Sequence, residues 1–175
     1  KHSNSHRADK YISDCIYKIP YQLMEKGLLL ETTGKTQKAL NMYQKAQSQI
    51  ESDTIASNMV EGRIEQIAMQ WMIQAEKLLG ESEYILAYNL VKKVADFSMQ
   101  GKKEIRRFKS WVILGEGKQF QEFGFIGRAM EKYSEALSLN KDLLFEVKSL
   151  QYKAGVHMAK LAMRADEFEE IQLAI

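Results

Sequence analysis

The chain has 175 residues, of which 45% are hydrophobic and 27% charged, so a folded core is expected and a disordered chain is excluded. The formal net charge of +2 argues against a general polyanion binder, and nucleic acid is therefore not the expected partner. A single cysteine, Cys15, excludes an internal disulfide framework and a cysteine-based zinc site.

Neither end of the sequence looks like a natural boundary. The chain begins at Lys1 rather than at methionine, and it ends in the apolar-faced segment EEIQLAI. A helical repeat array normally ends in a polar cap, so we expect a fragment of a longer protein. No apolar run approaches the roughly 20 residues that span a bilayer, so no membrane partner is expected.

The first helix pair is predicted over about 11–52. The segment Ala8–Ile19 suits a helix, and Pro20 is expected to open or kink the next one because it lacks an N–H. Gly34 then ends this helix and Thr36 caps its partner. The facing sides of the pair carry leucine, small and aromatic residues at helical spacing, namely Leu23, Gly27, Ala39, Tyr43 and Ala46.

The second pair is predicted over about 54–100. Its first helix carries an apolar stripe at three- and four-residue steps over six turns, formed by Val60, Ile64, Ile67, Trp71, Ala75 and Leu78. Gly80 stops this helix, Ser82 caps the next, and Gly101 closes the pair. Ala75 and Ala87 are expected where the two backbones approach most closely.

The third pair, over about 102–140, has the clearest pattern. One face of its first helix carries Trp111, Leu114 and Gly115, and one face of its second carries Ala129, Tyr133 and Ala136. The small residues Gly115 and Ala129 are expected to meet, as Gly27 and Ala39 do in the first pair. Trp71 and Trp111 are interpreted as core anchors, and Asn140 as a left-handed helix stop.

The fourth pair, over about 142–175, is incomplete. Val147, Leu150 and Ala154 begin the apolar stripe of a long helix, and Asp166 with Glu169 resembles the capping box of a following helix.

These pairs resemble the tetratricopeptide repeat in their Leu-Gly step, their turn and their small-aromatic-small spacing. The resemblance implies an all-α, right-handed, tetratricopeptide-like α-solenoid of antiparallel helix pairs, folded as a single module. The spacing departs from the family. Ala39 and Ala87 lie 48 residues apart, and Ala87 and Ala129 lie 42 apart, whereas the family period is about 34.

Long irregular pairs of this kind also resemble the FAT region of ATM-like phosphatidylinositol 3-kinase-related kinases. The resemblance is carried by Trp71 with IQAEKLLGESEYILAYNLVKKV, by Trp111, by MEKYSEAL and by YKAGVHMAKLAMRADEFEEI. It implies a non-enzymatic scaffold segment of a large DNA-damage checkpoint kinase in the nucleus. The alternative is a free-standing, peptide-binding or regulatory tetratricopeptide-type module, bacterial or eukaryotic, in the cytoplasm.

The sequence carries no kinase chemistry of its own. It has no glycine-rich phosphate loop and no His-Arg-Asp or Asp-Phe-Gly triplet, so we expect no enzyme activity and no cofactor. His2 and His6 lie four residues apart, but a frayed terminus is favoured over a metal site. His157 is interpreted as a surface or satisfied histidine, and Cys15 as a structural thiol.

Partner binding is predicted on the wall lined by the first helix of each pair. The predicted groove consists of Tyr21, Met24, Leu28, Met69, Met72, Glu76, Lys109, Val112 and Glu116. A methionine-rich, mostly apolar wall suits an amphipathic helix, from a partner protein or from the rest of the same protein. The alternative is that these side chains pack against a neighbouring helix layer.

A secondary basic patch follows at the start of the third pair, formed by Lys102, Lys103, Arg106 and Arg107, with Lys109 beside them. Such a run suits an acidic peptide, a phosphate group or a nucleic-acid backbone. A solvated helix face is the favoured interpretation, because Glu104 interrupts the run and no second basic strip accompanies it in the sequence.

Overall fold

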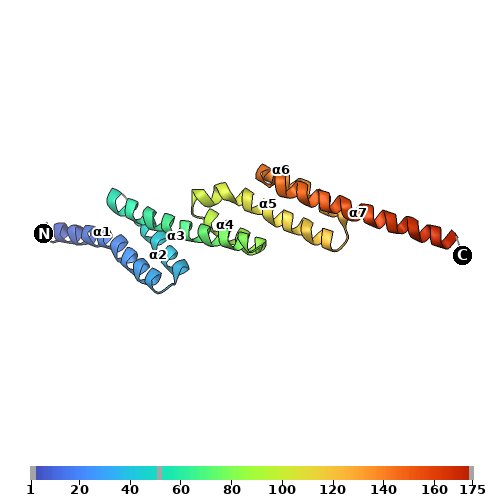
Figure 1. Ribbon diagram of the computed structural model, residues 1–175. Helices are drawn as coiled ribbons and strands as arrows, with labels where there is room; N and C mark the ends of the chain where they lie inside the picture. Colours follow the sequence, from blue (N-terminus) through green and yellow to red (C-terminus); the bar gives the residue numbers. More distant parts are fainter. Residues whose placement is uncertain (1–2, 51–52, 174–175) are drawn as a thin grey trace. The chain divides into compact units, whose positions relative to one another are not determined.

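The computed structural model describes the backbone of residues 3–50 and 53–173, with side chains from 18 to 165 apart from 51–52. Throughout this part of the chain the structure is helical and contains no strand, which confirms the predicted all-α class (Figure 1). The helices are α1 (Ser3–Thr32), α2 (Thr36–Ser48), α3 (Thr54–Gly80), α4 (Tyr84–Ala95), α5 (Met99–Glu122), α6 (Ile126–Leu139), the 3₁₀ turn η1 (Lys141–Leu143) and α7 (Leu144–Leu173).

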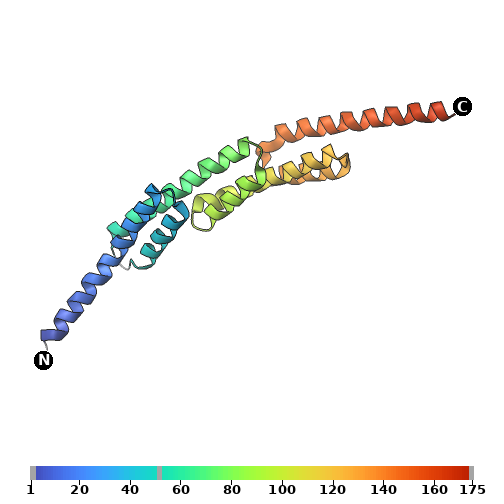
Figure 2. The same ribbon diagram turned by 90° about the horizontal axis from the view of Figure 1, so that it is seen from below.

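The helices form two compact units, Lys1–Met72 and Ile73–Ile175. In unit 1, α1 packs against α2; in unit 2, α5 packs against both α4 and α6, and α6 against α7. In unit 2, α7 continues beyond the ends of α5 and α6 (Figure 2). That the whole chain acts as a single module stays a prediction.

One hairpin turn occurs three times. Gly34, Ser82 and Gly124 each have a positive φ, of 72°, 64° and 80°. In each turn the following residue donates its N–H to a carbonyl five residues earlier, as Lys35 does to Leu30 at 2.9 Å and Phe125 to Phe120 at 2.8 Å. These hydrogen bonds satisfy carbonyls at the helix end, and glycine suits the left-handed backbone. The three turns therefore fix a common register for the three hairpins.

The register places a small residue seven positions before each turn: Gly27, Ala75 and Gly117. The buried glycines lie against rings, because a Cβ on Gly27 would stand 2.4 Å from Tyr43 and one on Gly117 would stand 2.6 Å from Tyr133. A Cβ on Gly115 would lie nearest to Tyr84 of the preceding hairpin, so this glycine faces α4 rather than its predicted partner Ala129. The predicted approach of Gly27 to Ala39 stays a prediction.

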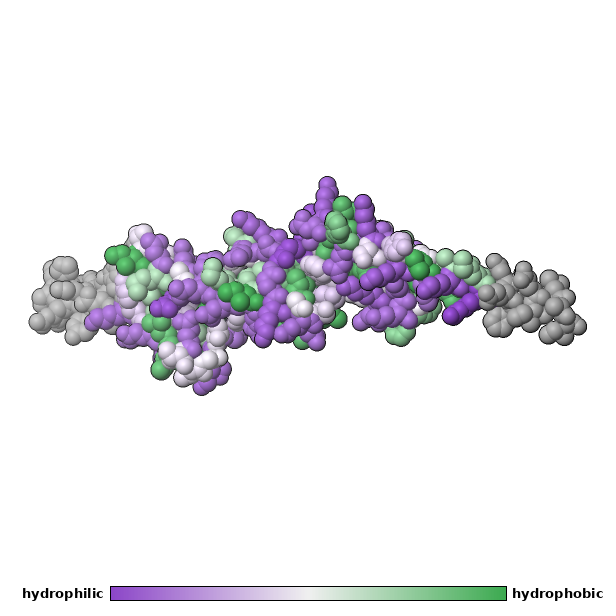
Figure 3. All heavy atoms as spheres, viewed as in Figure 1, coloured by the Kyte–Doolittle hydropathy of each residue, from purple (hydrophilic) through white to green (hydrophobic). Residues whose placement is uncertain are grey.

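The core of unit 2 gathers around these contacts and contains Ile113, Leu114, Ala129, Tyr133, Ala136, Leu143 and Val147. Trp111 is partly buried against this core and stacks on Tyr84, with ring centroids 6.0 Å apart. Trp71 is also only partly buried, so neither tryptophan is fully enclosed. Exposed apolar side chains lie among hydrophilic ones on the face seen in Figure 3.

Gly34 and Gly80 lie where the sequence predicted helix ends, but the predicted caps are wrong. Thr36 is the first residue of α2 and follows the cap position Lys35, which provides no side-chain cap. Ser82 has the left-handed turn conformation, and Glu83 occupies the cap position of α4.

Four further predictions about helix ends differ from the structure in whole or in part, although α6 does end just before Asn140 as predicted. Gly101 lies inside α5, which begins after Ser98, whose side chain accepts a hydrogen bond from the N–H of Gln100. Asn140 has an extended backbone and caps η1 by accepting from the N–H of Asp142. Pro20 lies inside α1, so it does not open a helix, and a kink there stays a prediction. Helix α7 continues through 166–169, where a new helix was expected.

Candidate functional site

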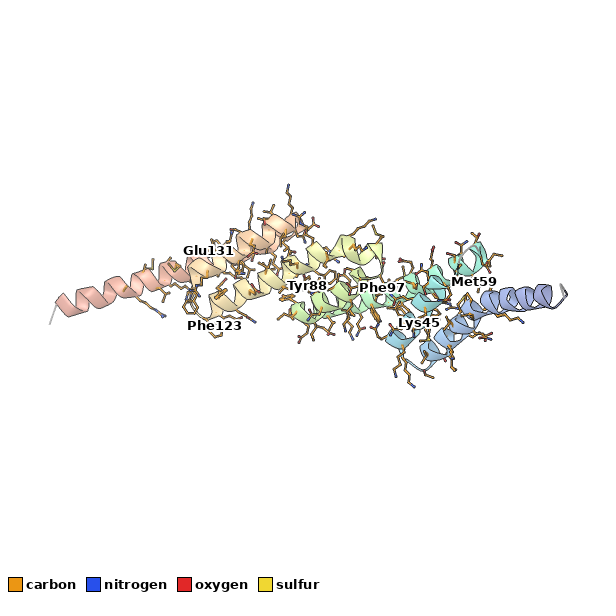
Figure 4. All side chains as sticks on the ribbon, turned by 180° about the vertical axis from the view of Figure 1, so that it is seen from behind. Lys45, Met59, Tyr88, Phe97, Phe123 and Glu131 are labelled. Carbon is orange, nitrogen blue, oxygen red and sulfur yellow. The ribbon has the colours of Figure 1, made fainter. Side chains whose placement is uncertain are left out.

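Unit 1 contains a cavity of about 280 Å³ beside the buried ring of Tyr43. Its lining comes from α1, α2 and α3 and consists of Met24, Leu28, Tyr43, Asn58, Met59, Gly62, Arg63 and Gln66. Met59 lies on α3 and is half exposed (Figure 4). The lining is thus mainly apolar, with one cationic side chain.

Hydrogen bonds hold the tyrosine of this cavity in place. The Tyr43 hydroxyl donates to Glu31 Oε2 at 2.7 Å, and Arg63 Nη1 lies 3.9 Å from the same oxygen. Burial, with the hydrogen bond to Glu31 as a second cause, raises the pKa of Tyr43. The hydroxyl therefore stays protonated at neutral pH and acts as a hydrogen-bond donor.

Unit 2 contains a cavity of about 440 Å³ beside Tyr133. It is more polar, and its lining residues are Lys118, Gln121, Glu122, Tyr133, Leu150, Lys153 and His157. The Tyr133 hydroxyl donates to Gln121 Oε1 at 2.6 Å. Burial raises the pKa of Tyr133.

Lys118 at the edge of this cavity is already paired. Its Nζ donates to Glu146 Oε1 at 2.7 Å and to the Tyr84 hydroxyl at 3.2 Å. Burial acts to lower the pKa of Lys118, but these hydrogen bonds outweigh it and raise the pKa overall. Lys153 and His157, both exposed, are the other basic side chains that line this cavity.

The two cavities occupy equivalent places in their hairpins. Leu28 and Lys118 each lie six residues before a turn glycine, and Tyr43 and Tyr133 each lie nine residues after it. Glu31 and Gln121, which accept from the two tyrosines, are equivalent as well. A repeated position in each unit therefore carries an open cavity with a fixed tyrosine in its wall.

The predicted groove residues are distributed over both units. Unit 1 holds Tyr21, Met24, Leu28, Met69 and Met72, and unit 2 holds Glu76, Lys109, Val112 and Glu116. Met24 and Met72 are each only 5% exposed, so they belong to the packed interior. Of the nine residues, the cavities described above bring together only Met24 and Leu28.

The other groove positions are more accessible, and several have partners. Tyr21 donates its hydroxyl to Asp53 Oδ2 at 2.7 Å, Glu76 is bonded to Arg107, and Glu116 is paired with Lys132 at 2.8 Å. Leu28, Met69 and Lys109 are exposed, and Val112 is partly buried.

The common register shows which position the sequence reasoning missed. Leu28 lies six residues before the turn residue Gly34. The residues six positions before the other two turn residues are Glu76 and Lys118, whereas the predicted groove contained Glu116 in place of Lys118. The sequence itself contains a signal for this register. Five residues of the first hairpin, Gly27, Gly34, Ala39, Tyr43 and Ala46, recur with the same identity 90 residues later, as Gly117, Gly124, Ala129, Tyr133 and Ala136.

The predicted basic patch is only partly free. Lys102, Lys103 and Arg106 are exposed, but Arg107 is bonded to Glu104 at 2.5 Å and to Glu76. The hydrogen bonds to these carboxylates overcome the effect of burial and raise the pKa of Arg107. Arg107 therefore links α5 to α3 within unit 2.

Other predicted features yield no site among the residues with described side chains. No group of three metal-ligating side chains occurs there, and no described helix is long and apolar enough to cross a membrane. His2, His6 and Cys15 lie outside the described side chains.

The chain was compared with protein families, curated proteins and solved structures, and no family model, curated protein or solved structure matches it.

Proposed function

We propose that the chain is a non-enzymatic protein-interaction scaffold whose first helices bind a segment of another protein or of its own parent chain. The observation that carries this proposal is the cavity beside Tyr43 and its equivalent beside Tyr133. A cavity that recurs at the same position of a repeat gives each unit a place for one side chain of a bound segment.

The two cavities favour different side chains. The unit 1 cavity offers Met24, Leu28 and Met59, so an apolar anchor fits there. The unit 2 cavity offers Lys153 and His157, so a polar or acidic side chain fits there. An amphipathic helix supplies both kinds of side chain.

We further infer that the hairpins form a right-handed, tetratricopeptide-like α-solenoid. The repeated turn and the small-residue position before it support this architecture. An ATM-like kinase scaffold in the nucleus and a free-standing cytoplasmic module both remain proposals for the parent protein. The full-length parent chain separates them, because only the first requires a kinase domain beyond these helices.

Single substitutions in a purified partner complex test the function. Met59→Glu and Lys153→Glu should each weaken binding more than about tenfold, as loss of a central interface contact does. Ile55→Glu and Lys148→Glu are matched controls, because both residues are exposed and line neither cavity. Equal affinity of all four variants for the partner would refute the proposal.

A further inference from the structure

The connection between α4 and α5 joins the basic run of α5 to Lys92 and Lys93 at the end of α4, so the run has cationic neighbours that the predicted basic patch did not contain. A Cβ on Gly101 would lie 2.4 Å from the backbone nitrogen of Ala95, so the end of α4 touches the start of α5. Phe97 lies in this connection (Figure 4). We define the basic corner as six cationic side chains of the last turn of α4 and the first half of α5: Lys92, Lys93, Lys102, Lys103, Arg106 and Lys109.

All six side chains are exposed, and none forms an ion pair within the part of the chain that the structure describes. Arg107 differs, because it lies in the same run but is bonded to Glu104 and Glu76. Glu104 is bonded to Arg107, so Asp96 is the one carboxylate of residues 92–109 that forms no ion pair with a described residue.

The positive charge of the chain is concentrated here. Residues 92–109 contain seven cationic and two anionic side chains, a local net charge of +5, whereas the whole chain carries +2. The remainder of the chain is therefore net negative, at −3.

This arrangement is unfavourable for the isolated protein. Lys102 and Lys103 near the start of α5 oppose the dipole of that helix, although Lys92 and Lys93 in the last turn of α4 interact favourably with the dipole of theirs. Like charges on the adjoining helices also repel each other. Only two carboxylates, Asp96 and Glu104, lie in the same segment, and Glu104 is bonded to Arg107. A bound anionic group would remove both costs.

We propose that the basic corner docks an acidic segment of another protein. A short run of aspartate or glutamate complements the local net charge of +5. A nucleic acid or an anionic membrane extends further and meets the net negative remainder of the chain. This surface shares no residue with the two cavities and does not depend on the proposed function.

Fluorescence anisotropy with a labelled decaglutamate peptide tests the proposal on the full chain. The wild type should bind the peptide, more weakly as salt increases. Lys102→Glu, Arg106→Glu and Lys109→Glu together should reduce the affinity about tenfold or more, since each surface ion pair contributes a few tenths to one kcal/mol. Glutamine at the same three positions should reduce the affinity for the peptide less than glutamate does.

The matched control is Lys141→Glu, Lys148→Glu and Lys160→Glu, which makes the same change in net charge at exposed lysines outside the corner. Its affinity should stay within about twofold of the wild type, because distant surface charges are screened. The proposal fails if wild type does not bind the peptide or if both triple variants lose affinity equally. It also fails if a 20-base-pair DNA duplex or phosphatidylserine vesicles bind the corner more tightly than the peptide does.

Discussion

Replacing Gly117 with alanine tests the packing of the third hairpin. The new Cβ would lie 2.6 and 2.8 Å from two ring carbons of Tyr133. That ring is fully buried and its hydroxyl is held by Gln121, so it has little room to move. Overpacking of this kind costs about 1–3 kcal/mol, whereas the higher helix propensity of alanine returns about 1 kcal/mol.

Gly155→Ala is the matched control, because Gly155 lies within α7 and a Cβ there meets nothing within 4 Å. The gain in helix propensity is common to both variants. The difference between their unfolding free energies therefore reports the overlap of the new Cβ with Tyr133. We expect Gly117→Ala to be about 1–3 kcal/mol less stable than Gly155→Ala.

Urea denaturation measures this difference through the fluorescence of Trp111, which packs against the core of unit 2. Trp71→Phe in every variant leaves Trp111 as the only tryptophan. The cost of Gly117→Ala should shrink when Tyr133 is changed to valine, the residue at the equivalent position Val91. Such a coupling is typically about 0.5–3 kcal/mol. Equal stability of Gly117→Ala and Gly155→Ala would refute the proposed contact.

Three further predictions concern single residues. Ser82→Gly should stabilise unit 2 by about 1 kcal/mol in thermal denaturation, because glycine accepts the positive φ that Gly124 also has. Met69→Glu should leave the melting temperature nearly unchanged, whereas Met72→Glu should lower it strongly, since the two side chains are 58% and 5% exposed. The pKa of Tyr43 is raised by folding, so its contribution to stability is complete below pH of about 10 and is lost as pH rises further. Tyr43→Phe should therefore flatten the decline of unfolding free energy measured between neutral and alkaline pH.

Local patterns were sufficient to predict the helical class and the helix ends at Gly34 and Gly80. They were not sufficient for the caps. A threonine or serine near a helix start predicts a cap, but at Thr36 and Ser82 the backbone hydrogen bonds of the turn determine which residue occupies that position. Gly101 looked like a helix end because glycine often marks one, yet here it permits close contact with Ala95.

The candidate site was harder to predict, because helical periodicity does not fix register between hairpins. The predicted register of the third hairpin was two residues too early, so Gly115 was assigned the position that Gly117 occupies. For the same reason the predicted groove contained Glu116 rather than Lys118. The burial of Met24 and Met72 depends on contacts with other helices, which a stripe on one helix does not reveal. The cavity beside Tyr133 also draws on α7, whose contacts with α5 and α6 are long-range.

Site-specific photocrosslinking tests the central claim most directly, that a partner segment binds beside the two equivalent tyrosines. A benzophenone side chain would replace Met59 or Lys153 at the cavities, and Lys45 or Glu131 on α2 and α6 as exposed controls (Figure 4). Mass spectrometry of the adducts formed with the purified partner identifies the contact positions. The account predicts adducts from positions 59 and 153 and none from 45 and 131. Adducts only from positions 45 and 131 would contradict it.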